Sequence, residues 1–517
     1  MNNRDLEATW AYHDGTKHSL RSIYNDAHHL DFANQPLPFK IYSDLEPIPL
    51  PQDISPTGMP ALAAISTVSV HPDGERIPDL ETLTSIFYFS AGITKRMAHP
   101  GGEIYFRAAA CTGALYHIEL YLVCGDLPGL KAGVYHFGVH DFALRKLRDG
   151  DYRSVLVQAS GGEPSTAQAP AVIVCTGTYW RNSWKYRSRT YRHCFWDNGT
   201  ILSNLLAIST AHRVPAQIVS GFVDESVNRL LGLDTRREVA LTLVPLGHAA
   251  DSSAGPAPDT PPLTLRTAPL SRTEVDYPDI RAMHEASSLV TEGEAAEWHG
   301  QTPASGFSGT SGKLFPLRPH ADEETAGEPI EQVIVRRGST RQFAHRPITF
   351  AQLSTVLHRA TRGVPADFLG PEGAMLNDLY LIVHAVDDLA PGAYVYHRDQ
   401  NALELLKEEG VSRQVGGYLG LQQALPADAS ADVFFLADLK PILERYGNRG
   451  YRAAQLEAGT IGGKLYLAAY AQRLGASGLT FFDDDVTTFF SPHAEGKSVM
   501  FLVALGVPLR RRMARSR

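Results

Sequence analysis

The stretch KYRSRTYR, residues 185–192, occurs a second time in the same chain as RYGNRGYR, residues 445–452. Each copy is followed by Gly-Thr-Ile, at 199–201 and at 459–461, and then by a long apolar pattern with helical spacing. The offset stays at 259 or 260 residues over more than 100 positions. Such a constant offset predicts that the chain contains two homologous domains.

Within each copy, short strands alternate with helices. The stretches 198–212 and 458–473 have apolar residues at helical spacing and few helix breakers, so a long central helix is expected in each copy. Short β-like runs lie at 120–123 and 171–175 in the first copy and at 379–383 and 432–436 in the second. We therefore expect an α+β domain in duplicate, with the two copies packed face to face as an intrachain pseudo-dimer.

The composition is that of a globular protein, with 517 residues, 44% hydrophobic and 20% charged. The formal charge of −8 argues against a general nucleic-acid binder. The N-terminus has no apolar signal region and no run of 18 apolar residues occurs, so we predict a cytoplasmic protein that does not cross a membrane. Cysteines occur without CxxC spacing, which argues against a disulfide scaffold or a cysteine-rich zinc site; they are Cys111, Cys124, Cys175 and Cys194.

A region rich in Pro, Ala, Ser, Thr and Gly separates the two copies. Only 277–290 within it has the pattern of a short helix. The predicted organisation is an N-terminal arm at 1–45, a first domain at 46–248, a linker at 249–328 and a second domain at 329–517.

Only the second copy has a candidate phosphate-binding motif. It begins with RRGSTRQF, in which Arg337, Ser339 and Arg341 offer two guanidinium groups and a hydroxyl to an oxyanion. Arg510, in the run 510–512 near the C-terminus, could add a further cation. The corresponding positions of the first copy hold Thr67, Ser69 and His71, and its last strand is followed by no arginines. The first copy is therefore expected to lack a phosphate site.

These motifs resemble those of the flavin-dependent nitroreductase superfamily, whose phosphate motif reads R-x-S-x-R/K-x-F. More narrowly, the chain resembles the SagB/ThcOx-type dehydrogenases. The arm, with Tyr12-His13 and the run 30–40, is similar to theirs, and the segment 107–116 resembles their R-x-x-P-S-x-G-A-L-Y, with Ala110 and Cys111 in place of Pro and Ser. The resemblance implies a mainly antiparallel sheet flanked by helices in each domain.

The resemblance also implies FMN at the interface of the two domains, one per chain. One partner of such a pair supplies the phosphate arginines and the other supplies the loop beside the isoalloxazine. The implied cofactor contacts are Arg337, Ser339, Arg341 and Arg510 from copy two, Arg107, Ala110, Cys111, Thr112 and Gly113 from copy one, and Gly478, Leu479 and Thr480 from a turn of copy two. Cys111 could equally be a small buried thiol without a redox role.

Lys185 and Tyr186 resemble the Lys-Tyr pair of the azoline-oxidising members of the family. A Lys amine or a Tyr phenol can move a proton while a flavin takes a hydride. The alternative is that Lys185 is a surface cation and Tyr186 a packing aromatic. In copy two Arg445 replaces the lysine, and arginine cannot serve as a base at ordinary pH.

The leading hypothesis is therefore an FMN-dependent oxidoreductase that dehydrogenates a heterocyclic or peptide-derived small molecule. NAD(P)H-dependent reduction of nitroaromatics or quinones is the alternative within the family, although no GxGxxG motif indicates a tightly held nicotinamide. A flavin-free binding or scaffold protein is the alternative outside it. The sequence leaves open whether the pseudo-dimer pairs again with another chain.

Overall fold

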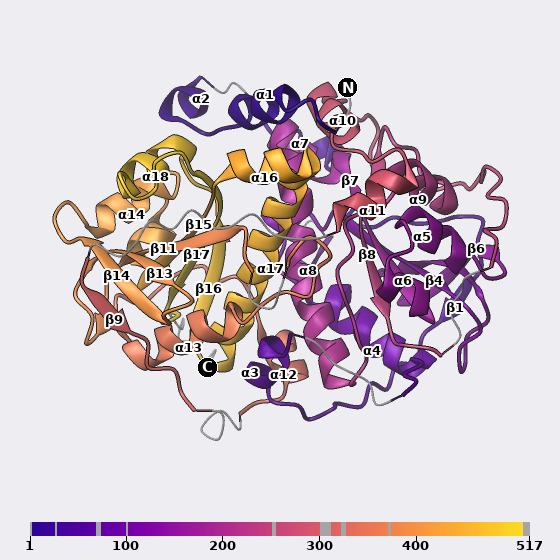
Figure 1. Cartoon of the computed structure of the whole chain (residues 1–517), viewed down its shortest axis with the longest axis horizontal. Helices are drawn as coiled ribbons and strands as arrows, with labels where there is room; N and C mark the ends of the chain where they lie inside the picture. Colours follow the sequence, from indigo (N-terminus) through magenta and orange to yellow (C-terminus); the bar gives the residue numbers. More distant parts are fainter. Residues whose placement is uncertain are drawn as a thin grey trace.

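The computed structural model describes residues 3–25, 28–68, 74–99, 102–250, 255–299, 312–321, 327–370 and 374–509. Two long helices, α8 (Thr190–Ala211) and α17 (Arg449–Ala471), lie side by side at the centre of the molecule, with one domain on each side (Figure 1). Both helices are buried along almost their whole length. A helix that is covered on all sides belongs to the core, so this pair joins the two domains into one hydrophobic interior.

Each domain has one main antiparallel sheet. In the first, the order is β1-β6-β5-β4-β7-β8, and in the second it is β16-β17-β15-β11-β13-β14-β9. The central strands are buried on both faces, which explains their continuous apolar sequences. The strands of sheet one are β1 (Pro47–Pro49), β4 (Ile118–Cys124), β5 (Gly133–Gly138), β6 (Ala143–Asp149), β7 (Ala171–Thr178) and β8 (Glu238–Leu246). Those of sheet two are β9 (Leu314–Pro316), β11 (Asn377–Val383), β13 (Gly392–His397), β14 (Ala402–Lys407), β15 (Ala431–Ala437), β16 (Gly475–Leu479) and β17 (Ser498–Gly506).

Helices flank both sheets in matching order. Those of domain one are α3 (Ala61–Ser66), α4 (Leu80–Ala91), α5 (Arg153–Ala159), α6 (Pro164–Gln168), α7 (Tyr179–Tyr186), α8 and α9 (Asp224–Leu231). Those of domain two are α12 (Ile330–Arg336), α13 (Phe350–Ala360), α14 (Arg413–Leu419), α15 (Ala424–Asp428), α16 (Leu439–Tyr446), α17 and α18 (Asp483–Phe490). The short strands β10 (Ile348–Thr349) and β12 (Val386–Asp387) pair with each other in domain two. The predicted α+β fold, with two tandem domains of antiparallel sheet flanked by helices, is confirmed.

The repeated motif forms two buried ion clusters that cross between the domains. In one, Asp483 of domain two accepts from Arg192 of domain one (2.6 Å) and from Arg189 (3.0 Å). In the other, Asp224 of domain one accepts from Arg449 (2.6 Å) and Arg452 (2.7 Å) of domain two. The arginines that revealed the duplication therefore connect the two copies to each other.

The N-terminal arm is also duplicated, because the region between the domains contains a second arm. Its helices α10 (Pro278–Ala286) and α11 (Glu292–Trp298) and strand β9 correspond to α1 (Glu7–Gly15), α2 (Leu20–Tyr24) and β1. The contacts repeat as well. Arg192 donates to the Thr16 hydroxyl (3.0 Å), and Arg452 donates to the Ser287 hydroxyl (2.8 Å). α1 and α10 lie next to each other at the top of the molecule (Figure 1).

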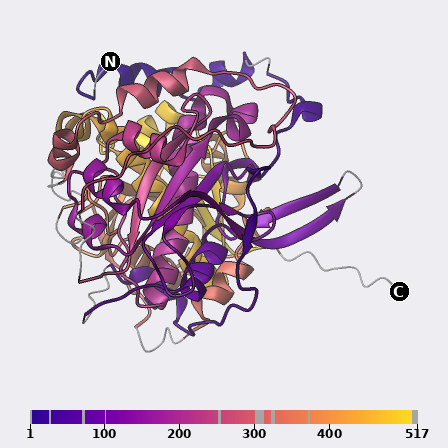
Figure 2. The same cartoon turned by 90° about the vertical axis from the view of Figure 1, so that its right-hand side faces the viewer.

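A two-stranded hairpin, β2 (Ile93–His99) and β3 (Gly102–Arg107), projects from the body of domain one (Figure 2). It lies between α4 and residue 107, so its second strand runs directly into the segment 107–113. In domain two only a short stretch separates α13 from residue 367, the equivalent of residue 107. The hairpin is thus found in domain one, directly before the segment 107–116 whose resemblance to the family motif was described above.

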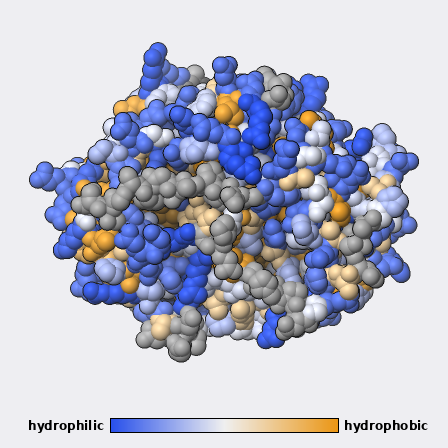
Figure 3. Space-filling view, in the orientation of Figure 1, coloured by the Kyte–Doolittle hydropathy of each residue, from blue (hydrophilic) through white to orange (hydrophobic). Residues whose placement is uncertain are grey.

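The face of the molecule in Figure 3 is largely hydrophilic, with hydrophobic residues scattered over it in small groups. Among the described residues, no helix is both long enough and apolar enough to cross a membrane.

Candidate functional site

The segment that follows the hairpin forms a tight turn at the boundary of the two domains. Gly113 has φ 62°, and Ala114 and Tyr116 also have positive φ. The Tyr186 hydroxyl lies so close to Gly113 that a Cβ there would be 2.8 Å from it. Glycine is therefore required at this position both for its backbone conformation and for the approach of the Tyr186 phenol.

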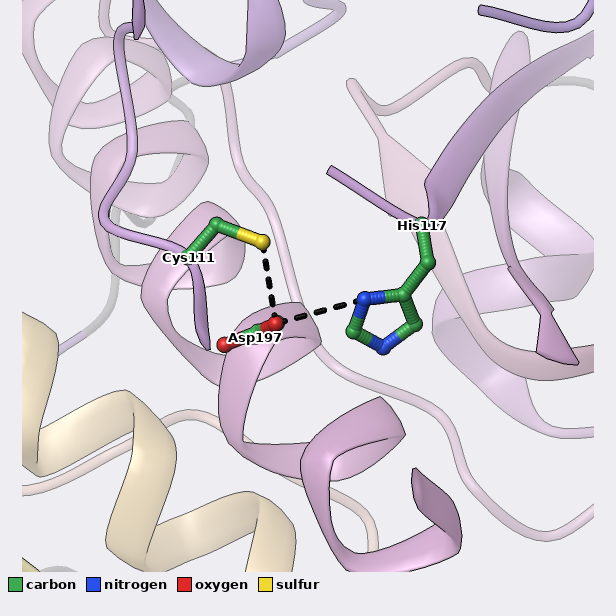
Figure 4. Close-up of side chains that lie close together, drawn as sticks. All are labelled: Cys111, His117 and Asp197. Atoms are coloured by element: carbon green, nitrogen blue, oxygen red, sulfur yellow. Dashed lines mark hydrogen bonds and ion pairs between the residues drawn. The ribbon is translucent and has the colours of Figure 1, made fainter. Parts of the chain in front are cut away.

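Asp197 of α8 holds this turn in place through hydrogen bonds. Its carboxylate accepts hydrogen bonds from the Thr112 N–H (2.9 Å), the Thr112 hydroxyl (2.8 Å) and the Cys111 thiol (3.0 Å). His117 Nδ1 lies 3.3 Å from the same carboxylate. Figure 4 shows Asp197 between Cys111 and His117, which do not bond to each other directly.

This arrangement keeps Cys111 a thiol. Burial and the neighbouring carboxylate of Asp197 raise the pKa of Cys111 well above its usual value. Burial lowers the pKa of His117 to about 3, so the imidazole is neutral. A nucleophilic cysteine needs a basic or cationic neighbour, and here the neighbour is an acid. The three side chains offer ligand-type atoms within 4.8 Å of one another, but Asp197 is already engaged by Thr112.

Lys185 and Tyr186 lie at the end of α7, beside this turn. Lys185 is exposed, and its Nζ lies 5.2 Å from the centre of the Tyr186 ring. Partial desolvation and the positive charge of Arg341 lower the pKa of Lys185. Burial, followed by the negative charge of Asp197, raises the pKa of Tyr186. The pair therefore combines a lysine shifted toward its neutral form with a phenol that stays protonated.

The phosphate motif of domain two lies against the turn of domain one. The Arg337 guanidinium donates to the backbone carbonyls of Ala108 (3.0 Å) and Arg107 (3.1 Å). Ser339 is half-buried with its Oγ 3.4 Å from the Tyr466 hydroxyl, and the Arg341 side chain is exposed. The structure thus brings Arg337 into contact with the segment 107–113 across the domain boundary, and Ser339 and Arg341 follow it in the same loop.

The side chain of Arg107 points away from this region. It donates to the Pro38 carbonyl of the arm (2.5 Å) and packs against the rings of Phe39 and Tyr116. Only its backbone faces the phosphate motif. Arg510, together with Ser69 and His71 of copy one, lies outside the described residues, whereas Thr67 is described at the end of α3.

The turn at the end of β16 completes the group. Gly478 N–H bonds to the Tyr466 hydroxyl, and Leu479 and Thr480 follow it, half-buried. Thr480 Oγ1 is buried and has no hydrogen-bond partner among the described residues. Arg189, beside the turn, has two further nitrogens, Nε and Nη2, that no described residue accepts from, whereas the equivalent nitrogens of Arg449 donate to the Ser220 and Phe222 carbonyls. Buried polar atoms without partners are costly, so this region has the chemistry of a site that is completed by a polar ligand.

Two residues of the site were not predicted from the sequence. Asp197 lies on α8, directly before the stretch predicted as the central helix, and Tyr466 lies on the equivalent helix of domain two. A signal for Asp197 was present, since Glu457 is its counterpart in copy two and bonds to the backbone of Leu376 and Asn377. An acid at the same place in both central helices thus accepts from backbone N–H groups of the segment at or before the first central strand of its own domain, β4 or β11.

The comparisons with known proteins agree with this architecture. The nitroreductase family matches residues 107–248 and 334–507, which is more than half of the chain. The chain belongs to the nitroreductase family. This is a family of oxidoreductases, and the match in two regions confirms the tandem arrangement.

Individual relatives give the same assignment. A solved structure of a nitroreductase-like protein from Anabaena variabilis superposes with a TM-score of 0.75 at 25% identity, covering 97% of this chain and 99% of that one. The nitroreductase-like protein MJ1384 of Methanocaldococcus jannaschii is 24% identical over 169 residues, 33% of this chain and 80% of its own length. The microcin B17-processing protein McbC of Escherichia coli is 26% identical over 145 residues, 27% of this chain and 53% of McbC. The likeness to McbC supports the expected SagB-type membership.

Proposed function

We propose that this nitroreductase-family protein is an FMN-dependent oxidoreductase with one cofactor site per chain, formed between domain one and the phosphate motif of domain two. The observation that carries the proposal is the contact of Arg337, from the motif that also holds Ser339 and Arg341, with the backbone of Arg107 and Ala108, which lead into the turn 110–113 of the other domain. The unpartnered Thr480 hydroxyl and the unpartnered Arg189 nitrogens support a polar ligand at this place.

The residues fit FMN in their chemistry. Arg341 and Ser339 would hold the phosphate, with Arg337 behind them, and the turns at 110–113 and 478–480 would face the ring. Arg510 stays a candidate for a further phosphate contact. FMN, when bound, would supply a two-electron acceptor.

Lys185 and Tyr186 would then move the proton. The lowered pKa of Lys185 increases the fraction of neutral amine, which can accept a proton from the substrate. Tyr186, with its raised pKa, keeps its proton and would donate a hydrogen bond to the substrate. Arg341 contributes to the lowered pKa of Lys185, because its charge disfavours a second cation nearby. The same charge opposes the raised pKa of Tyr186, which burial causes.

The substrate that best fits this pair is a heterocycle or a peptide-derived small molecule that undergoes two-electron dehydrogenation. The likeness to McbC, whose name describes microcin B17 processing, favours a peptide-derived substrate.

The test is the visible absorption spectrum of the purified protein before and after addition of FMN, with the released flavin counted per chain. One FMN per chain is the expected result. Two per chain would contradict the single site, and a colourless protein that takes up no FMN would leave the scaffold alternative.

A further inference from the structure

The duplication creates a second position that is related to the proposed cofactor site by pseudo-symmetry. The turn Ser220–Gly221 of domain one corresponds to Leu479–Thr480, and Tyr446 corresponds to Tyr186. The segment that begins at Asp367 corresponds to the one that begins at Arg107. The same three elements therefore meet at this second position, with the roles of the domains exchanged.

A carboxylate of the chain takes the hydrogen bonds that this second turn offers. Asp367 accepts from the Ser220 N–H (2.9 Å) and from the Gly221 N–H (2.7 Å). A negative charge at this place disfavours an anionic ligand, and copy one has no arginine motif to counter it. The position thus opposes the binding of a second FMN.

An indole of the chain fills the remaining space. Trp298, the last residue of α11, packs on Gly221 so closely that a methyl group added to Gly221 would overlap the ring. The Trp298 and Tyr446 rings lie 4.8 Å apart between centres, and Tyr446 is held by a hydrogen bond to the Phe368 carbonyl (2.7 Å). Arg449 also packs over the indole, at 5.9 Å.

The indole is held by shape and not by hydrogen bonding. Trp298 is 3% exposed, and its Nε1 has no hydrogen-bond partner among the described residues. A glycine floor, an aromatic wall and a cation above a flat ring together form a slot for a planar aromatic group.

We propose that this second position is a binding site for a planar aromatic ring of indole size, which the chain fills with its own Trp298. The second arm, through α11, supplies this internal ligand. The location of this site rests on its pseudo-symmetry with the proposed cofactor site. The contacts of Trp298 identify its occupant directly.

The first test is rescue by free indole. Trp298→Gly should lower the Tm by roughly 10 °C, because a large buried ring is lost. Millimolar indole should then raise the Tm of this variant by several degrees and leave the wild type unchanged. Leu381→Ala is the control, since it opens a smaller cavity in the centre of sheet two and should not respond to indole. A Trp298→Gly protein that is as stable as the wild type, or that ignores indole, would overturn the proposal.

A second test uses double-mutant cycles and needs no ligand. Gly221→Ala should lower the Tm of the wild type because the new methyl meets the indole, but should cause little further loss in Trp298→Ala. Equal losses in both backgrounds would contradict the slot. Both experiments are done without added FMN, so they stand whether or not the cofactor proposal holds.

Discussion

Gly199 of α8 and Gly459 of α17 face each other at the crossing of the two central helices. A Cβ on Gly459 would lie 2.6 Å from the Trp196 carbonyl oxygen, and a Cβ on Gly199 would overlap the backbone of Thr460. The two glycines are equivalent residues of the repeat, so the pseudo-two-fold axis passes near them. Their missing side chains allow the helices to touch through their backbones.

Replacing either glycine should therefore destabilise the protein. Gly459→Ala should lower the free energy of unfolding by about 1–3 kcal/mol, because overpacking outweighs the gain in helix propensity. Denaturant unfolding measures this change. Gly293→Ala is the matched control, since Gly293 lies in α11 with only the Thr291 hydroxyl within 4 Å. That variant should be as stable as the wild type or slightly more so, and equal losses in both variants would contradict the close helix contact.

The crossed ion clusters should make stability depend on acid pH. Arg449 and Arg452 hold the pKa of Asp224 at about 2, although burial alone would raise it. A carboxyl whose pKa is lower in the folded state stabilises the protein above its unfolded pKa of about 3.9, and this contribution is lost as the pH falls toward 2.

Asp224→Asn should remove that dependence and leave two buried guanidinium groups without a counter-charge. We expect a loss of about 3–5 kcal/mol at pH 7 and a smaller difference from the wild type near pH 2. Urea unfolding at several pH values measures both quantities. A difference that stays constant from pH 7 to pH 2 would show that Asp224 does not titrate as its ion pairs require.

The Lys-Tyr pair can be tested against its own pseudo-symmetric copy. Tyr186→Phe should lower kcat by roughly 10²–10⁴-fold if the phenol assists proton transfer. Tyr446→Phe removes the equivalent hydroxyl at the second position, which Trp298 fills. This variant should leave kcat unchanged and lower the free energy of unfolding by about 1 kcal/mol. The comparison requires an active substrate and a thermal-stability measurement. Equal effects on kcat would assign Tyr186 a structural role only.

The thiols should be unreactive in the folded protein. Burial raises the pKa of Cys124 and of Cys175 to about 12, and Cys111 and Cys194 are raised as well. Labelling with a thiol-specific disulfide reagent at pH 8 should be slow in buffer and should reach all four cysteines in denaturant. Rapid labelling of one thiol in the folded state, lost in Cys111→Ser, would contradict the account of the Asp197 cluster.

Much of the fold could be predicted because a motif that occurs in both copies marks the same structural element in each. The KYRSRTYR motif and the Gly-Thr-Ile that follows it located both central helices. The second arm could not be found in this way, because its offset is 271 residues at His13 and His284 and few identities remain. Its contacts are mostly through backbone groups and hydroxyls, which many sequences can provide.

The sequence could predict which residues form the candidate site, but not the directions in which their side chains point. The family resemblance implies that Arg337 and the 107–113 segment lie at one place, yet it does not tell that the Arg107 side chain turns to Pro38. Asp483 is the first of three consecutive aspartates, and only the structure shows that it is buried and paired with two arginines of the other domain. Side-chain direction depends on tertiary partners, and a single sequence does not contain them.

The presence of both homologous domains in one chain has an evolutionary consequence. In a homodimer built from this domain, any mutation alters both symmetry-related positions at once, so neither can change without the other. Joining the copies in one chain removes that constraint. One position could then lose its arginines and acquire Trp298 and Asp367, while the other kept Arg337, Ser339 and Arg341. With both copies in one chain, equivalent positions can differ, and here they do.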